Sequence, residues 1–197
     1  GMTIEAKKAI ENCDIIVGYT VYVELLKKYF GDKTFLSTPM TKEKDRVEMA
    51  LKEAETKNVA IICSGDSVVY GMAGLAYEMS VEYNDVGICV VPGVTAAISG
   101  SAVLGAPLTH DFCVISLSDL LTPWEKIEKR LECAAMGDFA VAIYNPSSKK
   151  RADYLMKACD IMLKYKTGDT VCGYVKNIGR DGETFEVMTL KELRECH

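Results

Sequence analysis

The sequence predicts an α/β protein of two domains, in which buried strands alternate with amphipathic helices. Residues 59–63 form a short apolar run rich in β-branched side chains, which is typical of a strand buried on both faces of a parallel sheet. Residues 86–91 repeat that pattern, and helical apolar spacing lies between the two runs. A Leu-Gly-Ala-Pro break at 104–107 marks the predicted boundary between domains 1–106 and 107–197. We expect a mostly parallel sheet in the first domain and a mixed sheet in the second.

In the first domain, helices are predicted where apolar residues recur at i, i+3, i+4 and i+7. Thr3 is the expected N-cap of the first helix. Gly18 is expected to end the first strand. The remaining elements are helices carrying 21–29, 42–56, 70–79 and 96–104, with strands at 15–17 and 34–36. The charged residues at the start of the long helix are expected on a solvated face; they are Lys42, Glu43, Lys44, Asp45 and Arg46.

In the second domain, the clearest signal is a helix start at Thr122-Pro123, with Thr122 as the N-cap and Pro123 at the first helical position. That helix is expected to bury Trp124, Ile127 and Leu131. The other predicted elements are strands at 112–116, 139–144, 170–175 and 185–188, and helices at 155–162 and 190–196.

Composition narrows the classes of function. The chain of 197 residues is 49% apolar and 26% charged, as expected of a globular protein, and its net charge of −5 argues against a nucleic-acid partner. No apolar run approaches the roughly 20 residues of a membrane span. The eight cysteines contain no Cys-x-x-Cys pair, so we expect reduced thiols in a cytoplasmic protein and no metal site.

Two strand-to-helix turns carry the strongest indication of a ligand site. Gly65 and Asp66 follow the strand at 59–63, and Pro92-Gly93 follows the strand at 86–91, with Thr95 as the expected cap of the next helix. Open α/β sheets bind ligands at the carboxyl ends of their strands. On local grounds alone, an ordinary turn and a plain capped helix explain these residues equally well. Two such turns on neighbouring strands favour a shared site.

Five ordered motifs resemble the tetrapyrrole methyltransferases, a class of S-adenosylmethionine enzymes. The turn Ser64-Gly65-Asp66 followed by Tyr70-Gly71 is similar to the family's Gly-Asp-Pro-x-x-Tyr-Gly element, and 91–96 is similar to its second cofactor segment. The segments 110–124, 144–151 and 175–183 resemble the precorrin-3B (cobalt-factor III) C17-methyltransferase branch. The resemblance covers nearly the whole chain.

The resemblance implies two α/β domains with a cofactor cleft between them, and methyl transfer from S-adenosylmethionine to C17 of a corrin precursor. S-adenosylhomocysteine is the implied product. The residues implied to hold the cofactor are Gly65, Asp66, Ser67, Val68, Val69, Thr95, Ala96, Tyr144, Asn145 and Lys176.

The implied substrate is a ring with many carboxylates, for which basic side chains are suitable counter-charges. The residues expected to contact it are Ser116, Ser118, Asp119, Lys149, Arg151 and Arg180, with Lys150 as a further cation. A solvated basic turn and a capped turn are the simpler alternatives for these residues. His110 is the candidate for proton transfer, although a hydrogen-bonded structural histidine is the commoner role. A homodimer is also implied.

The chain departs from the family pattern in two places. Ser67 stands where the family usually has Pro or Ala, and Val68 where this branch commonly has Gly. A valine there adds bulk beside the expected cofactor. Family members also open with a strand and a Gly-Pro-Gly loop and continue to a final strand, neither of which is visible here. Loss of an interior strand is expected to leave backbone groups unpaired on its two neighbours. A non-catalytic remnant that binds a tetrapyrrole or S-adenosylhomocysteine is therefore the alternative function.

Overall fold

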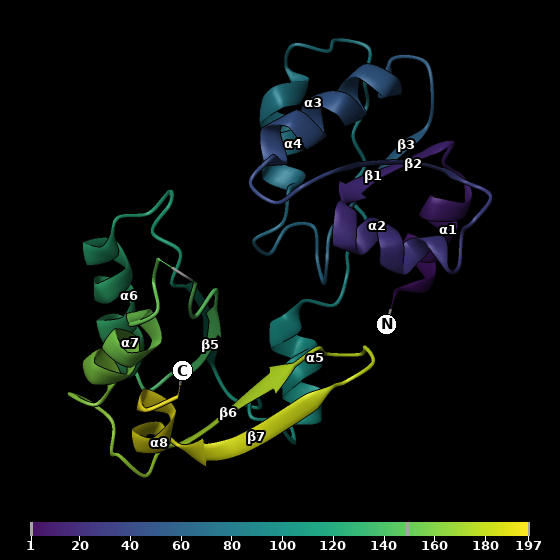
Figure 1. Ribbon diagram of the computed structural model, residues 1–197. Helices are drawn as coiled ribbons and strands as arrows, with labels where there is room; N and C mark the ends of the chain where they lie inside the picture. The colour runs from purple at the N-terminus through teal and green to yellow at the C-terminus, as the bar shows by residue number, and fades with distance from the viewer. Residues whose placement is uncertain (1, 149, 197) are drawn as a thin grey trace. The chain divides into compact units, whose positions relative to one another are not determined.

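The structure is a computed structural model that describes residues 2–148 and 150–196. Contacts within the chain define two compact units, Gly1–Thr95 and Ala96–His197 (Figure 1). The sequence placed its boundary after residue 106, whereas helix α5 (Ala96–Val103) stands in the second unit. The reason is packing, because Gly100 of α5 faces the side chains of Val175 and Ile178.

The first unit alternates helices and strands as predicted. Its elements are α1 (Ile4–Glu11), β1 (Ile15–Tyr19), α2 (Thr20–Lys27), β2 (Thr34–Thr38), α3 (Glu43–Ala54), β3 (Val59–Ile62) and α4 (Ala73–Ser80). The Thr3 hydroxyl accepts a hydrogen bond from the Ala6 amide, so the predicted N-cap of α1 is confirmed. The helix predicted to carry residues 21–29 is shorter than expected, because α2 ends at Lys27 and Tyr29 is 79% exposed.

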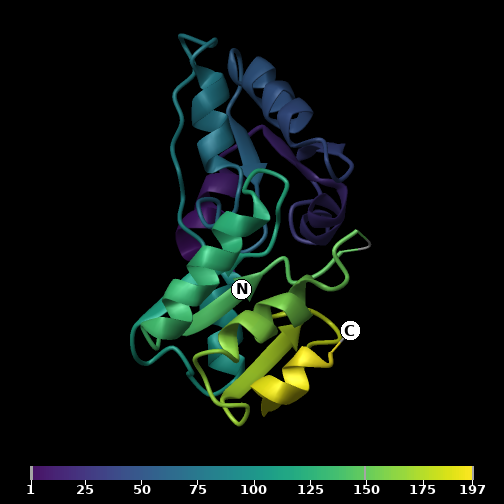
Figure 2. The same ribbon diagram turned by 90° about the vertical axis from the view of Figure 1, so that its left-hand side faces the viewer.

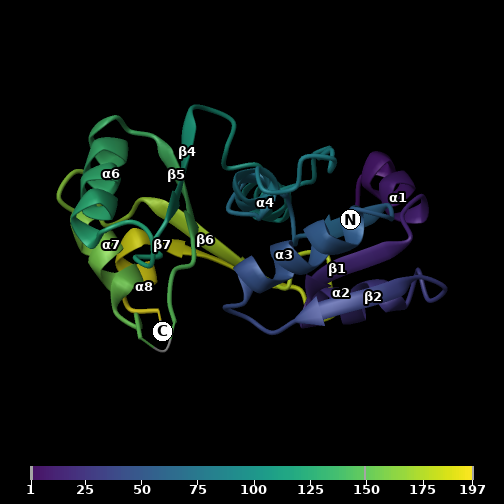
Figure 3. The same cartoon turned by 90° about the horizontal axis from the view of Figure 1, so that it is seen from above.

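The three strands form a parallel sheet in the order β2-β1-β3, covered on both faces. Ile16 packs with α1 and α2, whereas its neighbours Ile15 and Val17 point to the opposite face and pack with α3. This alternation follows from the two-residue period of a strand. Figure 3 shows β1 and β2 side by side in this sheet. Gly18 lies inside β1 and does not end it, because the pairing with β2 continues through Tyr19. A Cβ on Gly18 would overlap the side chain of Ile62, which accounts for glycine at this position.

The predicted strand at 86–91 is wrong as a strand. Its residues alternate between half-buried and exposed, as an extended chain does, and Val86 and Ile88 pack against the cluster beneath α3 and α4. Among the described residues, however, they have no ladder partner, and β3 pairs with β1 alone. Alternating apolar residues favour an extended conformation, but a β-strand also needs a neighbouring strand that pairs with its backbone groups.

The second unit contains a parallel pair and an antiparallel pair of strands. Its elements after α5 are β4 (Phe112–Ser116), α6 (Trp124–Met136), β5 (Ala140–Tyr144), α7 (Tyr154–Met162), β6 (Val171–Lys176), β7 (Thr184–Thr189) and α8 (Leu190–Arg194). The pair β4-β5 is parallel and β6-β7 is antiparallel, so both directions expected of the mixed sheet are present in two separate ladders. Figure 2 shows α8 beside α7, where Arg194 pairs with Asp160.

The main core of the second unit lies beneath α6, α7 and α8. Leu117, Ile127 and Leu131 are fully buried there, together with the thiol of Cys159. The predicted helix start is displaced, because α6 begins at Trp124 and Pro123 is its cap residue in an extended conformation. A proline at that position still suits the chain, since it needs no amide hydrogen bond.

All eight cysteines are unpaired, which agrees with the predicted reduced thiols. Burial raises the pKa of Cys159 to about 12, so that thiol is protonated and unreactive at neutral pH. Cys89 was expected within an apolar strand but is exposed. Within the described residues, every helix is too short or too polar to cross a bilayer.

Candidate functional site at the carboxyl ends of the strands

The turn that follows β3 is irregular over residues 63–72. The sequence predicted helical spacing from Tyr70, but Tyr70 has a φ of 54° and α4 begins at Ala73. The amide of Ala73 reaches back to the carbonyl of Ser67 at 3.0 Å. Gly71 packs so closely on the Ser67 carbonyl that no Cβ fits there. The chain therefore forms a closed loop in place of the first helical turn.

Asp66 joins this loop to the second predicted turn. Its Oδ1 accepts hydrogen bonds from the amides of Val68 at 2.8 Å and Val69 at 3.0 Å, and its Oδ2 accepts one from the amide of Gly93 at 2.8 Å. Backbone donation by Gly93, and then by Val69 and Val68, lowers the pKa of Asp66, although its burial opposes that shift. The Asp66 carboxylate therefore fastens two backbone segments together.

Gly93 is required at its position by this close approach. A Cβ on Gly93 would overlap the carbonyl oxygen of Gly65, and Gly65 itself has a φ of 78°. Two further hydrogen bonds hold the same region: Ser67 Oγ donates to the Val91 carbonyl at 3.5 Å, and Thr3 Oγ1 donates to the Pro92 carbonyl at 3.2 Å. The two predicted turns are therefore in direct contact, as the sequence expected of a shared site.

Several predicted cofactor residues present accessible surface on this first-unit site. Gly65 is exposed and Val68 is 64% exposed, while Ser67, Val69 and Thr95 are half-buried. The valine side chain at 68 thus points into open space from the rim of the loop and does not fill it. Its exposure explains how the loop accommodates a larger residue where the family pattern has glycine.

In the second unit, Tyr144 at the end of β5 meets the first turn of α5. The amide of Ala97 donates a hydrogen bond to the Tyr144 hydroxyl at 2.8 Å. Helix N-termini carry amides without partners in the helix itself, and this contact satisfies one of them. Tyr144 and Ala96 were both predicted to hold the cofactor, and the structure brings them together.

Ser116 connects the ends of the two parallel strands of the second unit. Its Oγ accepts hydrogen bonds from the amide of Ser118 at 3.1 Å and from Nδ2 of Asn145 at 2.9 Å. Asn145 has a φ of 52°, which asparagine tolerates better than most residues. These three predicted residues form one polar group at the carboxyl ends of β4 and β5.

Arg151 and Asp119 were predicted to contact substrate, but they also contact each other. The Arg151 Nε lies 3.7 Å from Asp119 Oδ1, and its Nη1 donates to the Leu117 carbonyl at 3.1 Å. The Tyr154 hydroxyl donates to Asp119 Oδ2 at 2.6 Å, and this bond raises the pKa of Tyr154. The Arg151 side chain is only 15% exposed. Its guanidinium therefore holds the loop after β4 in place, which the sequence did not predict.

The remaining predicted residues lie apart or outside these groups. His110 is exposed and precedes β4, so a whole strand, roughly 20 Å at 3.3 Å per residue, separates it from Ser116. Lys176 ends β6, with its ammonium 5.0 Å from the centre of the Tyr174 ring, and Arg180 is exposed in the turn that follows. Lys149 lies outside the described residues.

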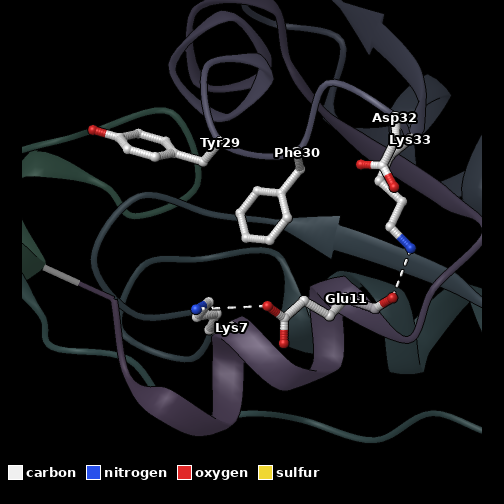
Figure 4. Close-up of a pocket in the computed structure, with 6 residues that line it drawn as sticks. All are labelled: Lys7, Glu11, Tyr29, Phe30, Asp32 and Lys33. Atoms are coloured by element: carbon white, nitrogen blue, oxygen red, sulfur yellow. Dashed lines mark hydrogen bonds and ion pairs between the residues drawn. The ribbon is translucent and has the colours of Figure 1, made fainter.

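A separate hollow lies in the first unit. It measures about 400 Å³ and is lined by Lys7, Glu11, Tyr29, Phe30, Asp32 and Lys33 (Figure 4). Lys33 directly precedes β2, and Glu11 is the last residue of α1, the helix that leads into β1, so the hollow lies towards the amino ends of these strands. Its lysines are already bound, Lys7 to the Glu11 carboxylate at 3.6 Å and Lys33 to the Glu11 carbonyl at 2.6 Å. Ligands of open α/β sheets bind at the opposite edge, and we assign no function to this hollow.

Comparison with known proteins identifies the relatives of this chain. A family model described as "Tetrapyrrole (Corrin/Porphyrin) Methylases" matches residues 1–194. The chain belongs to this family. It is 45% identical over 98% of its length to a "Probable cobalt-factor III C(17)-methyltransferase" of Salmonella typhimurium, of which it covers 80%. It is 47% identical over 98% of its length to the "Cobalt-factor III methyltransferase" of Priestia megaterium, but spans only 37% of that longer protein.

A solved structure supports the same assignment of this tetrapyrrole methylase. The methyltransferase CobJ superposes with a TM-score of 0.89 at 35% identity, over 96% of this chain and 81% of that one. The fold class predicted from the motifs is confirmed, and so is the resemblance to the C17-methyltransferase branch, because the relatives carry that name.

Two features of this site were missed by reasoning from the sequence. The first is the bond between Asp66 and Gly93, for which the Pro-Gly dipeptide was the available signal. The second is Arg46, expected on a solvated face but only 3% exposed. No local signal separates Arg46 from the lysines beside it, because burial is set by how α3 packs on the sheet. Among residues 2–148 and 150–196, no group of three potential ligands is arranged for a metal ion.

Proposed function

We propose that this chain is an S-adenosylmethionine-dependent C-methyltransferase that acts at C17 of a cobalt-factor III-type tetrapyrrole in cobalamin biosynthesis. The observation that carries the proposal is the match to the Salmonella relative, which extends over nearly all of this chain and four-fifths of that protein. The names of the relatives favour an enzyme over a non-catalytic remnant. They also favour a cobalt-containing substrate over the metal-free precorrin-3B.

The residues of the first unit fit a nucleoside cofactor that carries an amino acid. Asp66 and Gly93 hold two backbone turns in contact, and this leaves Gly65 and Val68 on an accessible rim. Backbone groups of such turns are suited to bind a ribose and an adenine edge. From the second unit we propose Ala96, Tyr144, Asn145 and Lys176 as further cofactor contacts, because the family resemblance implies them.

The bound cofactor supplies an activated methyl group. The task of the protein is then to align an acceptor carbon with that methyl and to exclude water, and orientation of this kind is worth effective molarities of up to about 10⁵–10⁸ M. Asp66 contributes by keeping the turns in a fixed conformation, so that little reorganisation is needed on binding. His110 precedes β4. We therefore propose it as the proton-transfer residue only if the substrate extends to the amino end of that strand.

The substrate side of the proposal rests on exposed cations. Arg151 pairs with Asp119 and donates to the Leu117 carbonyl. We therefore propose that it supports the loop after β4 and does not contact the substrate directly. Lys150 and Arg180 are exposed and remain the proposed counter-charges for ring carboxylates, with Ser116 and Ser118 as neutral contacts. Lys149 is proposed for the same role on its position in the sequence alone. We further propose a cytoplasmic homodimer.

The first test is calorimetric titration with S-adenosylhomocysteine. We expect micromolar binding by the wild-type protein and its loss in Thr95→Trp, in which an indole is placed beside both turns. Thr56→Trp, an exposed position after α3, is the matched control and is expected to bind as the wild type does. A folded wild-type protein that does not bind contradicts the proposed cofactor site.

The second test is transfer of a labelled methyl group. Incubation with cobalt-factor III and S-adenosylmethionine carrying a deuterated methyl is expected to add one labelled methyl to the macrocycle by mass spectrometry. Labelling of precorrin-3B alone would replace the cobalt-containing substrate with the metal-free one. Sedimentation equilibrium tests the dimer, and a monomer at micromolar concentration would contradict it.

A further inference from the structure

Arg46 is the only charged residue that is buried in the part of the chain the structure describes. It lies in the first turn of α3, where the positive end of the helix dipole disfavours a cation. Burial of a guanidinium also removes it from water at a high cost in free energy. Stability of the helix alone therefore does not account for an arginine at this position.

The guanidinium is held by neutral acceptors at the carboxyl edge of the parallel sheet. Nε donates to the Thr38 hydroxyl at 3.0 Å, and Nη2 donates to the carbonyl of Pro39 at 3.0 Å. The guanidinium carbon also lies 5.9 Å from the centre of the Tyr19 ring. These contacts join α3 to the ends of β1 and β2. Among residues 2–148 and 150–196, no carboxylate pairs with Arg46.

The same side chain contacts one end of the loop that follows β3 and acts electrostatically on the other. Nη1 donates to the sulfur of Met72 at 3.3 Å, and Met72 is the residue directly before α4. At the other end, the positive charge of Arg46 partly offsets the rise in pKa that burial causes at Cys63. Cys63 directly follows β3, so one cation contacts the last residue of the loop and lies close to the first.

We propose that Arg46 is a positioning residue that fixes the conformation of residues 64–71, the loop that carries Gly65 and Asp66. The planar guanidinium donates in several directions at once, which a lysine ammonium cannot reproduce in the same geometry. A loop fixed before the ligand arrives loses less conformational freedom on binding. The link to cofactor affinity rests on the proposed function, whereas the ordering of the loop does not.

Amide hydrogen exchange of the ligand-free protein tests the ordering. In Arg46→Met, we expect the amides of Val68 and Val69 to exchange at least about tenfold faster, because local opening of the loop becomes easier. Amides of α1 and of the second unit should be unchanged. Lys44→Met, an exposed change on the same helix, is the control and should leave the loop as in the wild type. Unchanged exchange of Val68 and Val69 in Arg46→Met would overturn the proposal.

Two variants separate this role from general support of the fold. Arg46→Lys keeps the charge but not the fork of donors, so we expect intermediate exchange. Met72→Leu removes only the sulfur acceptor and is expected to loosen the loop without unfolding the unit, which decides the matter if Arg46→Met does not fold. Met72→Leu with the exchange rates of the wild type would then overturn the proposal.

Binding of S-adenosylhomocysteine gives the functional readout. At an unfolding midpoint close to that of the wild type, Arg46→Met is expected to weaken binding by about tenfold or more, with partial recovery in Arg46→Lys. Wild-type protein that does not bind contradicts the proposed function and leaves the exchange result to decide the role of Arg46. Wild-type affinity in a variant with a loosened loop would overturn the link between the loop and the ligand.

Discussion

The carboxyl ends of the strands are organised differently in the two units. In the first unit, the turns are held by backbone groups, with one carboxylate, Asp66, accepting three amide hydrogen bonds, and with glycine at the points of closest approach. In the second unit, side chains bond to side chains as well as to the backbone, as in Ser116 with Asn145 and Asp119 with Tyr154. A turn built from backbone tolerates few substitutions, whereas a side-chain network is expected to lose its contacts one at a time.

The largest effect is expected from Gly93→Ala. The added methyl would overlap the Gly65 carbonyl, so the two turns must separate. We expect a loss of about 1–3 kcal/mol in the free energy of unfolding, as for overpacked sites, and loss of S-adenosylhomocysteine binding. Urea denaturation and calorimetry measure the two effects. Gly87→Ala, which meets no atom within 4 Å, is the control. Equal stability of the two variants would contradict the close contact.

Asp66→Asn is expected to have the next largest effect at neutral pH. The amide nitrogen of asparagine cannot accept the bonds that one carboxylate oxygen receives, and hydrogen bonds to a charged group contribute about 1.5–3 kcal/mol. We expect a loss of about that size in urea denaturation at pH 7. Asp85→Asn, an exposed aspartate of the same unit, serves for comparison and should be neutral. A neutral Asp66→Asn would show that the bonds do not stabilise the turns.

The pH dependence of that difference provides a separate test. Because the folded pKa of Asp66 is lowered, its contribution to stability is complete above the ordinary aspartate pKa and is lost as the pH falls through the folded value. The gap in unfolding free energy between wild type and Asp66→Asn should therefore be constant from about pH 5 to 8 and should shrink below about pH 4. A gap that grows on acidification has the wrong sign for this mechanism.

The smallest effect is expected in the second unit, from Tyr144→Phe. The Ala97 amide loses its acceptor, at a cost of about 0.5–1.5 kcal/mol, while the aromatic ring remains in place. Thermal unfolding measures this loss, with Tyr165→Phe as the control on an exposed ring. A loss as large as that of Gly93→Ala would mean that the two units do not differ in the way described.

Much of the fold could be predicted because its signals are local. β-branched apolar runs mark β1 and β3, and Thr3 supplies the N-cap of α1. The segment at 86–91 carries the same local signal but forms no ladder, since pairing depends on a neighbouring strand that periodicity cannot reveal. The same holds for the candidate site. The glycines that mark the two turns can be recognised in the sequence, whereas the backbone amides that bond to Asp66 cannot.

The sequence by itself determined the α/β class, the order of most elements and the family. These depend on residue spacing and on motifs that are contiguous in the chain. Only the tertiary structure decided which charges act as structural groups. Arg46 and Arg151 look like their exposed neighbours in sequence, yet Arg46 is held by acceptors at the end of β2 and Arg151 by the Leu117 carbonyl after β4. Burial and hydrogen bonding are properties of three-dimensional neighbours, and those neighbours are set by packing.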